Sequence, residues 1–319
     1  GEAAPTAHRR ITMHANDLFT AITDQLVADI EAGAGTWRMP WHTLADAGTP
    51  LSIDHRPYRG LNALWLPVVA ASHGWTCGVW ATYRGWQRHG AQVRRGEKGT
   101  QVVLWKPTTA KPDSDDRVEG SGPRRRLLAR AYTVFAVEQV DGADEIIARH
   151  AAQLADRDTP ERIAAAEAFF AAVGARVVEG GNRGSYQPAT DTIHLPSLSQ
   201  FDEAAHYYGT SAHEHVHWTG HADRLARDLT GRFGSDAYAA EELVAELGAA
   251  MWCAQFGISA VTRPDHAAYL AGWLRVLRTD ARALVTVSSR AQAAVDHLTA
   301  CAGITTTQET DTTEDSAAA

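Results

Sequence analysis

Two histidines and a glutamate between residues 213 and 217 have the types and spacing of a metal-dependent hydrolase. The segment His213-Glu214-His215-Val216-His217 fits the pattern H-E-x-x-H. On a helix, histidines four residues apart lie one above the other, so both imidazoles can reach one metal ion. Glu214 lies beside them, where its carboxylate can take a proton from metal-bound water. The pattern predicts a zinc site for hydrolysis, provided that the segment is helical and that a further ligand exists.

A catalytic zinc ion usually has three protein ligands and one water, so the two histidines need a partner. A segment with Ser235 as N-cap and Gly257 after its end is expected to be a helix that places Glu242 and Glu246 on one face. One carboxylate could bind metal while the other orients a ligand imidazole. The residues alone leave open Glu241, His221, and Asp223 in the spacing H-x-x-G-x-x-D. For oxyanion stabilisation they leave a choice among Tyr207, Tyr208 and Tyr238.

The composition is that of an ordinary folded protein. At 319 residues the chain is too long for a typical single core, and 45% hydrophobic with 21% charged residues is usual for globular proteins. No apolar run approaches the roughly 18 residues of a membrane span, and residues 1–14 lack the apolar core of a signal peptide. The three cysteines have no C-x-x-C spacing, which argues against a disulfide framework. We therefore expect a cytoplasmic protein.

Charge and tryptophan are unevenly distributed along the chain. Residues 1–140 contain 17 Lys and Arg against 13 Asp and Glu, a net charge of +4, whereas the remainder contains 13 against 25, a net of −12. Seven of the ten tryptophans precede residue 110. Surfaces of this composition suit single-stranded nucleic acid, because cations neutralise phosphates and aromatic rings stack on unpaired bases. The asymmetry predicts two domains with different partners.

Apolar periodicity and turn residues divide the chain into expected elements. Apolar residues at every fourth position from Leu18 to Ile30 form one stripe of a helix over residues 17–32. Thr159 and Pro160 begin a helix that stops at Gly174. Further helices are expected at 61–71, 204–218, 235–257, 265–277 and 280–298. Strands are expected at 101–105 and 129–137, which pair across an exposed loop at 106–126, and at 176–179 and 191–195.

Several motifs in the first half occur in the order found in one known domain. They are Trp37-Arg38-Met39-Pro40-Trp41, Tyr58-Arg59-Gly60-Leu61-Asn62, Trp80-Ala81-Thr82-Tyr83 and the basic turn at 90–99. Together they resemble the N-terminal domain of ArdC-type antirestriction proteins over about residues 15–140. That domain is also found in related plasmid primases. The resemblance implies binding of single-stranded DNA. Ala136, where the family usually has Asn, and the pair Tyr83-Arg84, where Gln is common, depart from the family pattern.

The second half resembles the zincin-like metallopeptidase domain of the same ArdC-type proteins, which is also similar to SprT-like and ImmA/IrrE-type peptidases. The resemblance rests on residues 211–221 and 238–250. It implies His213 and His217 as zinc ligands, Glu214 as the catalytic base and Glu242 as the third ligand, with Glu241 still open. His215, where the family often has Leu, should point away from the metal into a surface or partly buried position. In zincin folds a strand above this helix binds extended peptide, and residues 193–196 are the candidate strand.

These observations predict an α+β fold with two domains. The first, at 15–145, is a small mixed α+β domain that binds single-stranded DNA, and the second, at 155–302, is a mainly helical zincin-like domain with a small sheet. Residues 303–319 are expected to be a disordered tail. The residues expected to contact DNA are Trp41, Arg59, Asn62, Trp80, Tyr83, Trp86, Arg94, Arg95 and Lys98.

The expected function is that of an antirestriction protein. It would bind single-stranded DNA, protect incoming plasmid or phage DNA, and cleave DNA-associated proteins with zinc. The alternative is a non-catalytic DNA-binding protein whose zinc site is structural or relic. A nuclease is disfavoured, because the sequence has no evident two-metal cluster.

Overall fold

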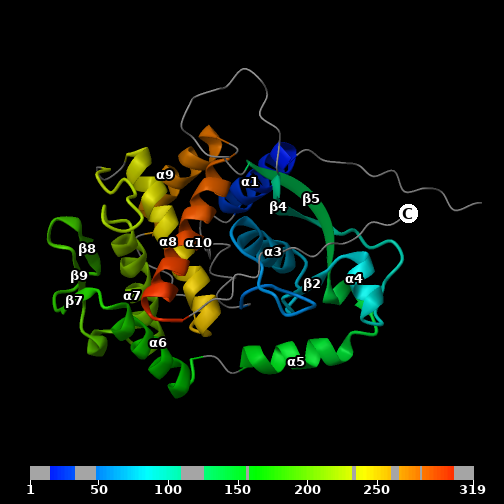
Figure 1. The fold of residues 1–319 in the computed structure, drawn as a ribbon, viewed down its shortest axis with the longest axis horizontal. Helices are drawn as coiled ribbons and strands as arrows, with labels where there is room; N and C mark the ends of the chain where they lie inside the picture. The colour runs from blue at the N-terminus through cyan, green and yellow to red at the C-terminus, as the bar shows by residue number, and fades with distance from the viewer. Residues whose placement is uncertain are drawn as a thin grey trace, which may run out of the picture.

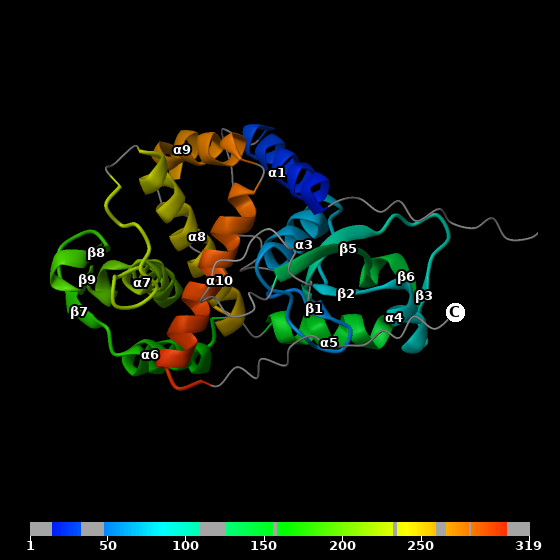
Figure 2. The same ribbon diagram turned by 45° about the horizontal axis from the view of Figure 1, so that its top comes forward.

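The computed structural model describes residues 15–32, 48–108, 126–155, 158–231, 235–259, 266–280 and 282–304. Figure 1 and Figure 2 show the N-terminal sheet on one side of the molecule and the C-terminal helices on the other, so the predicted α+β class is confirmed. Trp41, most of the expected loop at 106–126 and nearly all of the expected tail lie outside the described residues. Within the described ranges, no helix is long and apolar enough to cross a membrane.

A four-stranded sheet forms the centre of the N-terminal half. Its strands, in spatial order, are β1 (Leu51–Ser52), β2 (Val79–Ala81), β5 (Arg126–Ala136) and β4 (Thr100–Thr108). β4 and β5 form the expected antiparallel hairpin, in which Thr100 lies opposite Val134. Helix α3 (Leu61–Ser72) covers one face, where Leu66 packs in a buried cluster with Trp80 and Val134. The predicted helix at 61–71 and both predicted strands are confirmed.

Successive residues of β2 point to opposite sides of the sheet, so Val79 and Ala81 face away from α3. Several further elements cover this opposite face. They are α4 (Tyr83–Arg88), β3 (Gln92–Val93), a 3-10 turn (Val137–Gln139), β6 (Val140–Asp141) and α5 (Asp144–Ala155). Thr82 begins α4, since its side chain accepts a hydrogen bond from the N–H of Gly85. This start directs Trp86 inward, where it packs with Val79 and Ala81.

Cap residues define the helices of the C-terminal half as the sequence predicts. Thr159 caps the start of α6 (Pro160–Val173), and Gly174 ends that helix at a φ of 75°. Ser235 caps the start of α8 (Asp236–Phe256), and Gly257 ends it at a φ of 67°. The other helices are α7 (Ala204–Thr219), α9 (His266–Thr279) and α10 (Ala283–Cys301), with 3-10 turns at Pro188–Thr190 and Leu198–Gln200.

A small three-stranded sheet lies against α7. Its order is β7 (Arg176–Glu179), β9 (Thr192–Leu195) and β8 (Ser185–Gln187), with β9 parallel to β7 and antiparallel to β8. The prediction that residues 193–196 bind peptide by strand addition is wrong, because β9 is the central strand and both of its edges are already paired. β8, which the sequence did not predict, is the edge strand on the far side of β9 from β7.

Side chains from both halves of the chain share one hydrophobic core. It extends from Phe19 of α1 (Ala15–Ala32) and Leu61 of α3 to Trp252 of α8 and Leu298 of α10. α1 packs against α9 and α10, and α3 packs against α10 (Figure 2). The gap between the two expected domains, 146–154, lies within helix α5. The two halves therefore meet through a packed interface as well as through the chain between them.

Candidate metal centre

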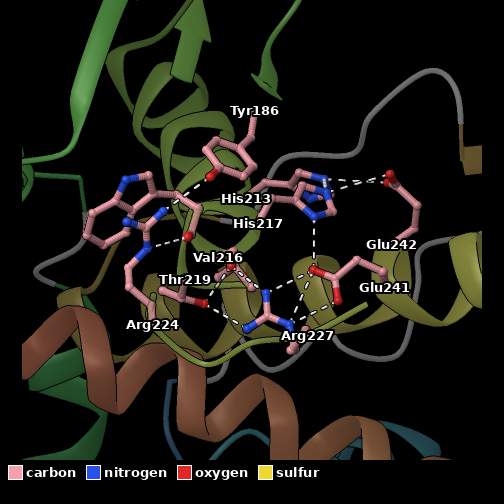
Figure 3. A network of polar contacts seen from close by, with 10 residues as sticks. Tyr186, His213, Val216, His217, Thr219, Arg224, Arg227, Glu241 and Glu242 are labelled. Carbon is pink, nitrogen blue, oxygen red and sulfur yellow. Dashed lines mark hydrogen bonds and ion pairs between the residues drawn. The ribbon is translucent and has the colours of Figure 1, made fainter. Parts of the chain in front are cut away.

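The two histidines of the H-E-x-x-H segment converge on Glu242 of the neighbouring helix (Figure 3). The Nε2 atoms of His213 and His217 lie 3.2 Å apart. The carboxylate of Glu242 reaches both, with Oε2 at 3.6 Å from His213 Nε2 and Oε1 at 3.6 Å from His217 Nε2. One ligand atom from each residue lies within 4.8 Å of the other two. Two imidazole nitrogens and one carboxylate oxygen form the donor set of a catalytic metal site with a further position for water, so these residues fit a divalent metal.

Two other carboxylates of α8 occupy the far sides of the same imidazoles. Glu246 Oε1 lies 3.3 Å from His213 Nδ1, and Glu241 Oε1 lies 3.2 Å from His217 Nδ1. Each histidine therefore has a carboxylate on its Nδ1 side, while both Nε2 atoms face Glu242. This geometry favours Glu242 over Glu241 and Glu246 as the third ligand. Glu241, which hydrogen-bonds to His217 Nδ1, has the orienting position that holds a metal-binding imidazole in place, and Glu246 lies at ion-pair distance from His213.

Neighbouring groups favour the ionised form of two carboxyls in this cluster. Burial alone raises the pKa of Glu242, but the imidazoles of His213 and His217 and a hydrogen bond from Tyr238 outweigh it and lower the pKa to about 2. Burial likewise opposes ionisation of Glu241, whose pKa is lowered by His217 and by the guanidinium of Arg227. Both carboxyl groups are therefore anionic at neutral pH, as metal binding and imidazole orientation require.

The two remaining candidate ligands lie outside the cluster. The side chain of Asp223 is 87% exposed and lies 3.5 Å from His221 Nδ1. His221 follows Gly220, the residue that caps the C-terminal end of α7, so it does not continue the histidine face of the helix. The spacing H-x-x-G-x-x-D therefore does not bring an aspartate to this site.

Glu214 borders a pocket beside the three ligand candidates. Other lining groups are Gly184, Ser185 and Tyr186 at β8, Asp228 and Leu229 after α7, and Tyr238 of α8. Glu214 is 3% exposed, and a Cβ atom at position 184 would lie 3.1 Å from its Oε1. A side chain at position 184 would therefore require the Glu214 side chain or the turn before β8 to shift.

His215 points to the opposite side of α7, as predicted, but it is completely buried instead of partly exposed. Its Nδ1 lies 2.8 Å from the carbonyl oxygen of Ser211, and its ring packs on Phe170 with centroids 4.4 Å apart. Burial lowers the pKa of His215 to about 4. These contacts make it a neutral packing residue of the helix.

The structure distinguishes the three tyrosines considered for oxyanion stabilisation. The hydroxyl of Tyr207 donates to Glu179 at 2.9 Å, and Tyr208 is buried against Phe170. Tyr238 lines the pocket and hydrogen-bonds to Glu242.

The sequence analysis predicts no role for two arginines after α7 that the structure places beside the site. Arg224 lies over the ring of Trp218, 3.8 Å from its centroid, and donates to Asp191 and to Tyr186 of β8. Arg227 donates to Glu241, as described below. Neither belongs to a periodic apolar pattern. Arg224-Leu225 is part of the resemblance to the metallopeptidase domain, but no spacing signal marks Arg227.

Two of the tryptophans predicted to bind DNA belong to the core. Trp80 and Trp86 are completely buried, and Trp86 Nε1 donates to the carbonyl oxygen of Phe135 at 3.0 Å. Neither ring has a face open to a base, so the prediction that they contact DNA does not hold in this structure. Aromatic composition alone does not reveal which rings are buried.

Three predicted DNA contacts are already engaged within the protein. Asn62 bonds to the backbone N–H and carbonyl of Val103 at 2.9 and 2.6 Å, so its amide connects α3 to β4. Arg59 forms an ion pair with Asp296 of α10. Arg94 binds Glu97 at 3.0 Å and the carbonyl oxygens of Glu138 and Val140. We correct Asn62 to a structural residue, because both ends of its amide are occupied.

The other predicted contacts within the described ranges are open to solvent. Tyr83 is 43% exposed, and Arg95 and Lys98 are exposed. Their surface lies on α4 and on the turn before β4.

Comparison with known proteins identifies the family. A model of the N-terminal domain of anti-restriction factor ArdC matches residues 16–135, and a model of zincin-like metallopeptidases matches residues 164–290. The metal-free crystal structure of the antirestriction protein ArdC from plasmid R388 has a TM-score of 0.74 at 36% identity, covering 90% of this chain and 98% of that one. The chain belongs to the ArdC-type antirestriction family. The resemblance inferred from the motifs is thereby confirmed in both halves.

Other relatives of this ArdC-type chain extend the comparison. The Mn(II)-bound structure of the R388 protein has a TM-score of 0.71 at 34% identity, covering 90% and 98% of the two chains. Protein y4eC of Sinorhizobium fredii is 44% identical over 88% of this chain and 91% of its own length. A DNA primase TraC of Escherichia coli is 36% identical over 81% of this chain, which spans 25% of the primase. The Mn(II) in a close structural relative and the zincin-like match support a divalent metal.

Proposed function

We propose that this ArdC-type protein holds a zinc ion at His213, His217 and Glu242 and hydrolyses peptide bonds of proteins that it meets on single-stranded DNA. This activity would protect incoming mobile-element DNA. The observation that carries the proposal is the convergence of two imidazole nitrogens and a carboxylate oxygen beside Glu214, in a pocket bordered by an edge strand.

The residues around the pocket provide the groups that peptide hydrolysis requires. When bound, the metal supplies a Lewis acid that lowers the pKa of water toward about 7 and polarises a carbonyl group. Glu214 acts as the general base, which accepts a proton from the attacking water and passes it to the leaving amine. Tyr238 lines the pocket, and its O–H, which donates to Glu242 in this structure, would turn to the negative charge that develops on the carbonyl oxygen.

The substrate is proposed to bind as an extended peptide beside β8. Ser185 and Tyr186 belong to this edge strand and line the pocket. Edge strands carry backbone N–H and C=O groups that can pair with an added strand. Arg224 supports this strand, because it donates to the hydroxyl of Tyr186 at 3.2 Å while it lies on Trp218 of α7.

For single-stranded DNA, the candidate surface is the exposed side of α4 and the turn before β4. The ring of Tyr83 packs edge-on against Phe135, with centroids 6.4 Å apart, and its hydroxyl accepts a hydrogen bond from Gln92. These contacts fix the orientation of an exposed ring, and exposed aromatic rings can stack on unpaired bases. The exposed cations nearby in sequence are Arg84, Arg88, Arg95 and Lys98. They supply the positive charge that phosphates require.

The two proposed sites lie at opposite ends of the molecule. In Figure 1 and Figure 2, α4 lies at the right and α7 with β8 at the left. DNA on α4 would therefore leave the metal pocket free for protein. Among the described residues that line the pocket, carboxylates outnumber the one guanidinium, that of Arg183, and repel phosphates, which disfavours the nuclease alternative. They belong to Glu214, Asp228, Glu241 and Glu242.

The proposal is tested with Glu214→Gln, which keeps the shape of the side chain but cannot accept the proton. The variant is expected to keep its metal content and its affinity for single-stranded DNA, and to lose protection of transformed DNA against restriction. Glu167→Gln, at an exposed position of α6, is the matched control. Unchanged protection by Glu214→Gln would refute the peptidase proposal and support the alternative in which DNA binding alone protects.

A further inference from the structure

The guanidinium of Arg227 lies at the centre of a buried hydrogen-bond network below His217 (Figure 3). Its Nε donates to Glu241 Oε2 at 2.9 Å, and its Nη2 donates to Glu241 Oε1 at 2.9 Å. Nη1 donates to the hydroxyl of Thr219 at 2.8 Å, and Nη2 also donates to the carbonyl oxygen of Val216 at 2.6 Å. The side chain is 5% exposed. Arg227 therefore binds α7 and α8 together directly behind the ligand histidine.

The loop after α7 is shaped to deliver this side chain. The chain reverses after Gly220, and the N–H of Arg227 donates to the carbonyl oxygen of Gly220 at 3.0 Å. A Cβ atom at position 220 would lie 3.0 Å from Arg227 Nη2. The absence of a side chain at 220 thus gives the guanidinium room to pass beneath the helix end.

Donor and acceptor chemistry fixes the direction of the bond between Glu241 and His217. Glu241 is an acceptor, since Arg227 has only donors and both oxygens of Glu241 receive them. The His217 Nδ1 atom, 3.2 Å from Glu241 Oε1, must therefore carry the proton of that hydrogen bond. In the neutral imidazole the lone pair is then on Nε2, which faces His213 and Glu242.

We propose that Arg227 is a positioning residue of the metal site: it holds Glu241 so that His217 presents the unprotonated Nε2 to the metal. The inference rests on the proposed metal site, because the tautomer of His217 affects function only if a metal binds there. The tautomer of His217 can be measured in metal-free protein, so the two claims can fail separately.

Arg224 is the matched control, because it is a second arginine of the same loop that bonds across the structure without touching Glu241 or a ligand histidine. It donates to Asp191, Tyr186 and the carbonyl oxygen of Trp218. A general loss of loop packing would affect Arg224→Gln and Arg227→Gln alike, whereas a positioning role separates them.

The first measurement is Zn²⁺ affinity, by competition with a chromophoric chelator, for wild type, Arg227→Gln, Glu241→Gln and the double variant. Loss of an outer partner of a metal ligand typically weakens metal binding roughly 10–100-fold. We expect each single variant to fall in this range, the double variant to be no weaker than the weaker single variant, and Arg224→Gln to stay near wild type. Additive losses, or an equal loss in Arg224→Gln, would overturn the proposal.

The second measurement reads the tautomer directly. In metal-free wild type, at a pH at which the ring of His217 is neutral, its ¹⁵N chemical shifts should show a protonated Nδ1 and an unprotonated Nε2. Arg227→Gln should shift this ring toward a mixture of tautomers. If Arg227→Gln does not fold, Arg227→Lys, which keeps the charge but lacks the planar fork, is used in its place. A wild-type ring protonated on Nε2, or a tautomer unchanged in the Arg227 variants, would overturn the proposal even if zinc binds.

Discussion

Gly184 lies against the carboxylate of Glu214, so closely that a Cβ atom at position 184 would lie 3.1 Å from Oε1 of the glutamate and 3.0 Å from Cγ2 of Thr210. The turn before β8 and the H-E-x-x-H helix are thus packed so closely that a larger residue would make one of them shift. This contact relates the edge strand proposed for substrate to the carboxylate proposed as base.

Replacement of Gly184 should impair catalysis while leaving metal binding intact. In Gly184→Val, either the Glu214 carboxylate or the turn before β8 must move, and displacements of about 1 Å in an active site can cost up to about 100-fold in rate. We expect kcat for peptide hydrolysis to fall at least about tenfold, with wild-type zinc content. Asn182→Ala, at an exposed position of the same turn, is the comparison, and Gly184→Ala should be intermediate. Full activity of Gly184→Val would contradict the placement of Glu214 as the base.

Metal content should distinguish Glu242 from the aspartate that the sequence left open. Glu242→Ala removes a carboxylate 3.6 Å from both Nε2 atoms, whereas Asp223→Ala removes an exposed group paired with His221. We expect Glu242→Ala to weaken zinc binding by more than the roughly 10–100-fold that follows loss of a residue that only orients a metal ligand. Asp223→Ala should bind zinc like wild type, as measured by elemental analysis after dialysis. Loss of zinc in Asp223→Ala but not in Glu242→Ala would instead make Asp223, in the loop after α7, the third ligand.

Two aromatic substitutions should affect different properties of the protein, one its affinity for DNA and the other its stability. Tyr83→Ala removes an exposed ring and should weaken binding of single-stranded DNA by about 1–3 kcal/mol with little change in stability. Trp86→Ala removes a completely buried ring and should lower the free energy of unfolding by about 3–5 kcal/mol. Fluorescence titration with an oligonucleotide and urea unfolding measure the two quantities. Wild-type DNA affinity in Tyr83→Ala would exclude the α4 surface.

The acid stability of the protein should depend in part on His150 of α5. This side chain is buried, and burial lowers its pKa below the ordinary value of 6.5. The folded state therefore disfavours the charged imidazole, so the neutral residue contributes stability above pH 6.5. That contribution decreases as the pH falls from 6.5 toward the folded pKa. In metal-free protein, His150→Gln should reduce the dependence of the unfolding free energy on pH below 6.5, and an unchanged dependence would contradict this assignment.

Local signals in the sequence predict much of this structure. The H-E-x-x-H spacing places His213 and His217 on one face of α7 whatever surrounds the helix, and the Thr159 and Ser235 caps define helix starts by hydrogen bonds within one turn. The order of strands in the small sheet could not be predicted in this way. β8 has only three residues, so its pairing with β9 depends on contacts across the sheet that no short pattern encodes.

Local sequence patterns also do not predict which side chains are buried or which residues a loop brings into contact. Trp80 and Tyr83 occur in one motif, yet Trp80 is buried in the core and Tyr83 is exposed, because the first belongs to a strand covered by α3 and the second begins α4. The role of Arg227 depends on an irregular loop that returns it to Glu241. Such a contact follows from the fold and from no spacing in the chain.

The central claim is that Glu214 drives peptide hydrolysis at the metal site, and cleavage itself tests it most directly. Proteins that coat single-stranded DNA would be incubated with zinc-loaded wild type or Glu214→Gln, and new peptide termini would be identified by mass spectrometry. We expect new termini with wild type, their loss with Glu214→Gln at equal zinc content, and their recovery on mixing in wild type. New termini produced equally by both proteins, or by neither while wild type still protects DNA in cells, would contradict the account.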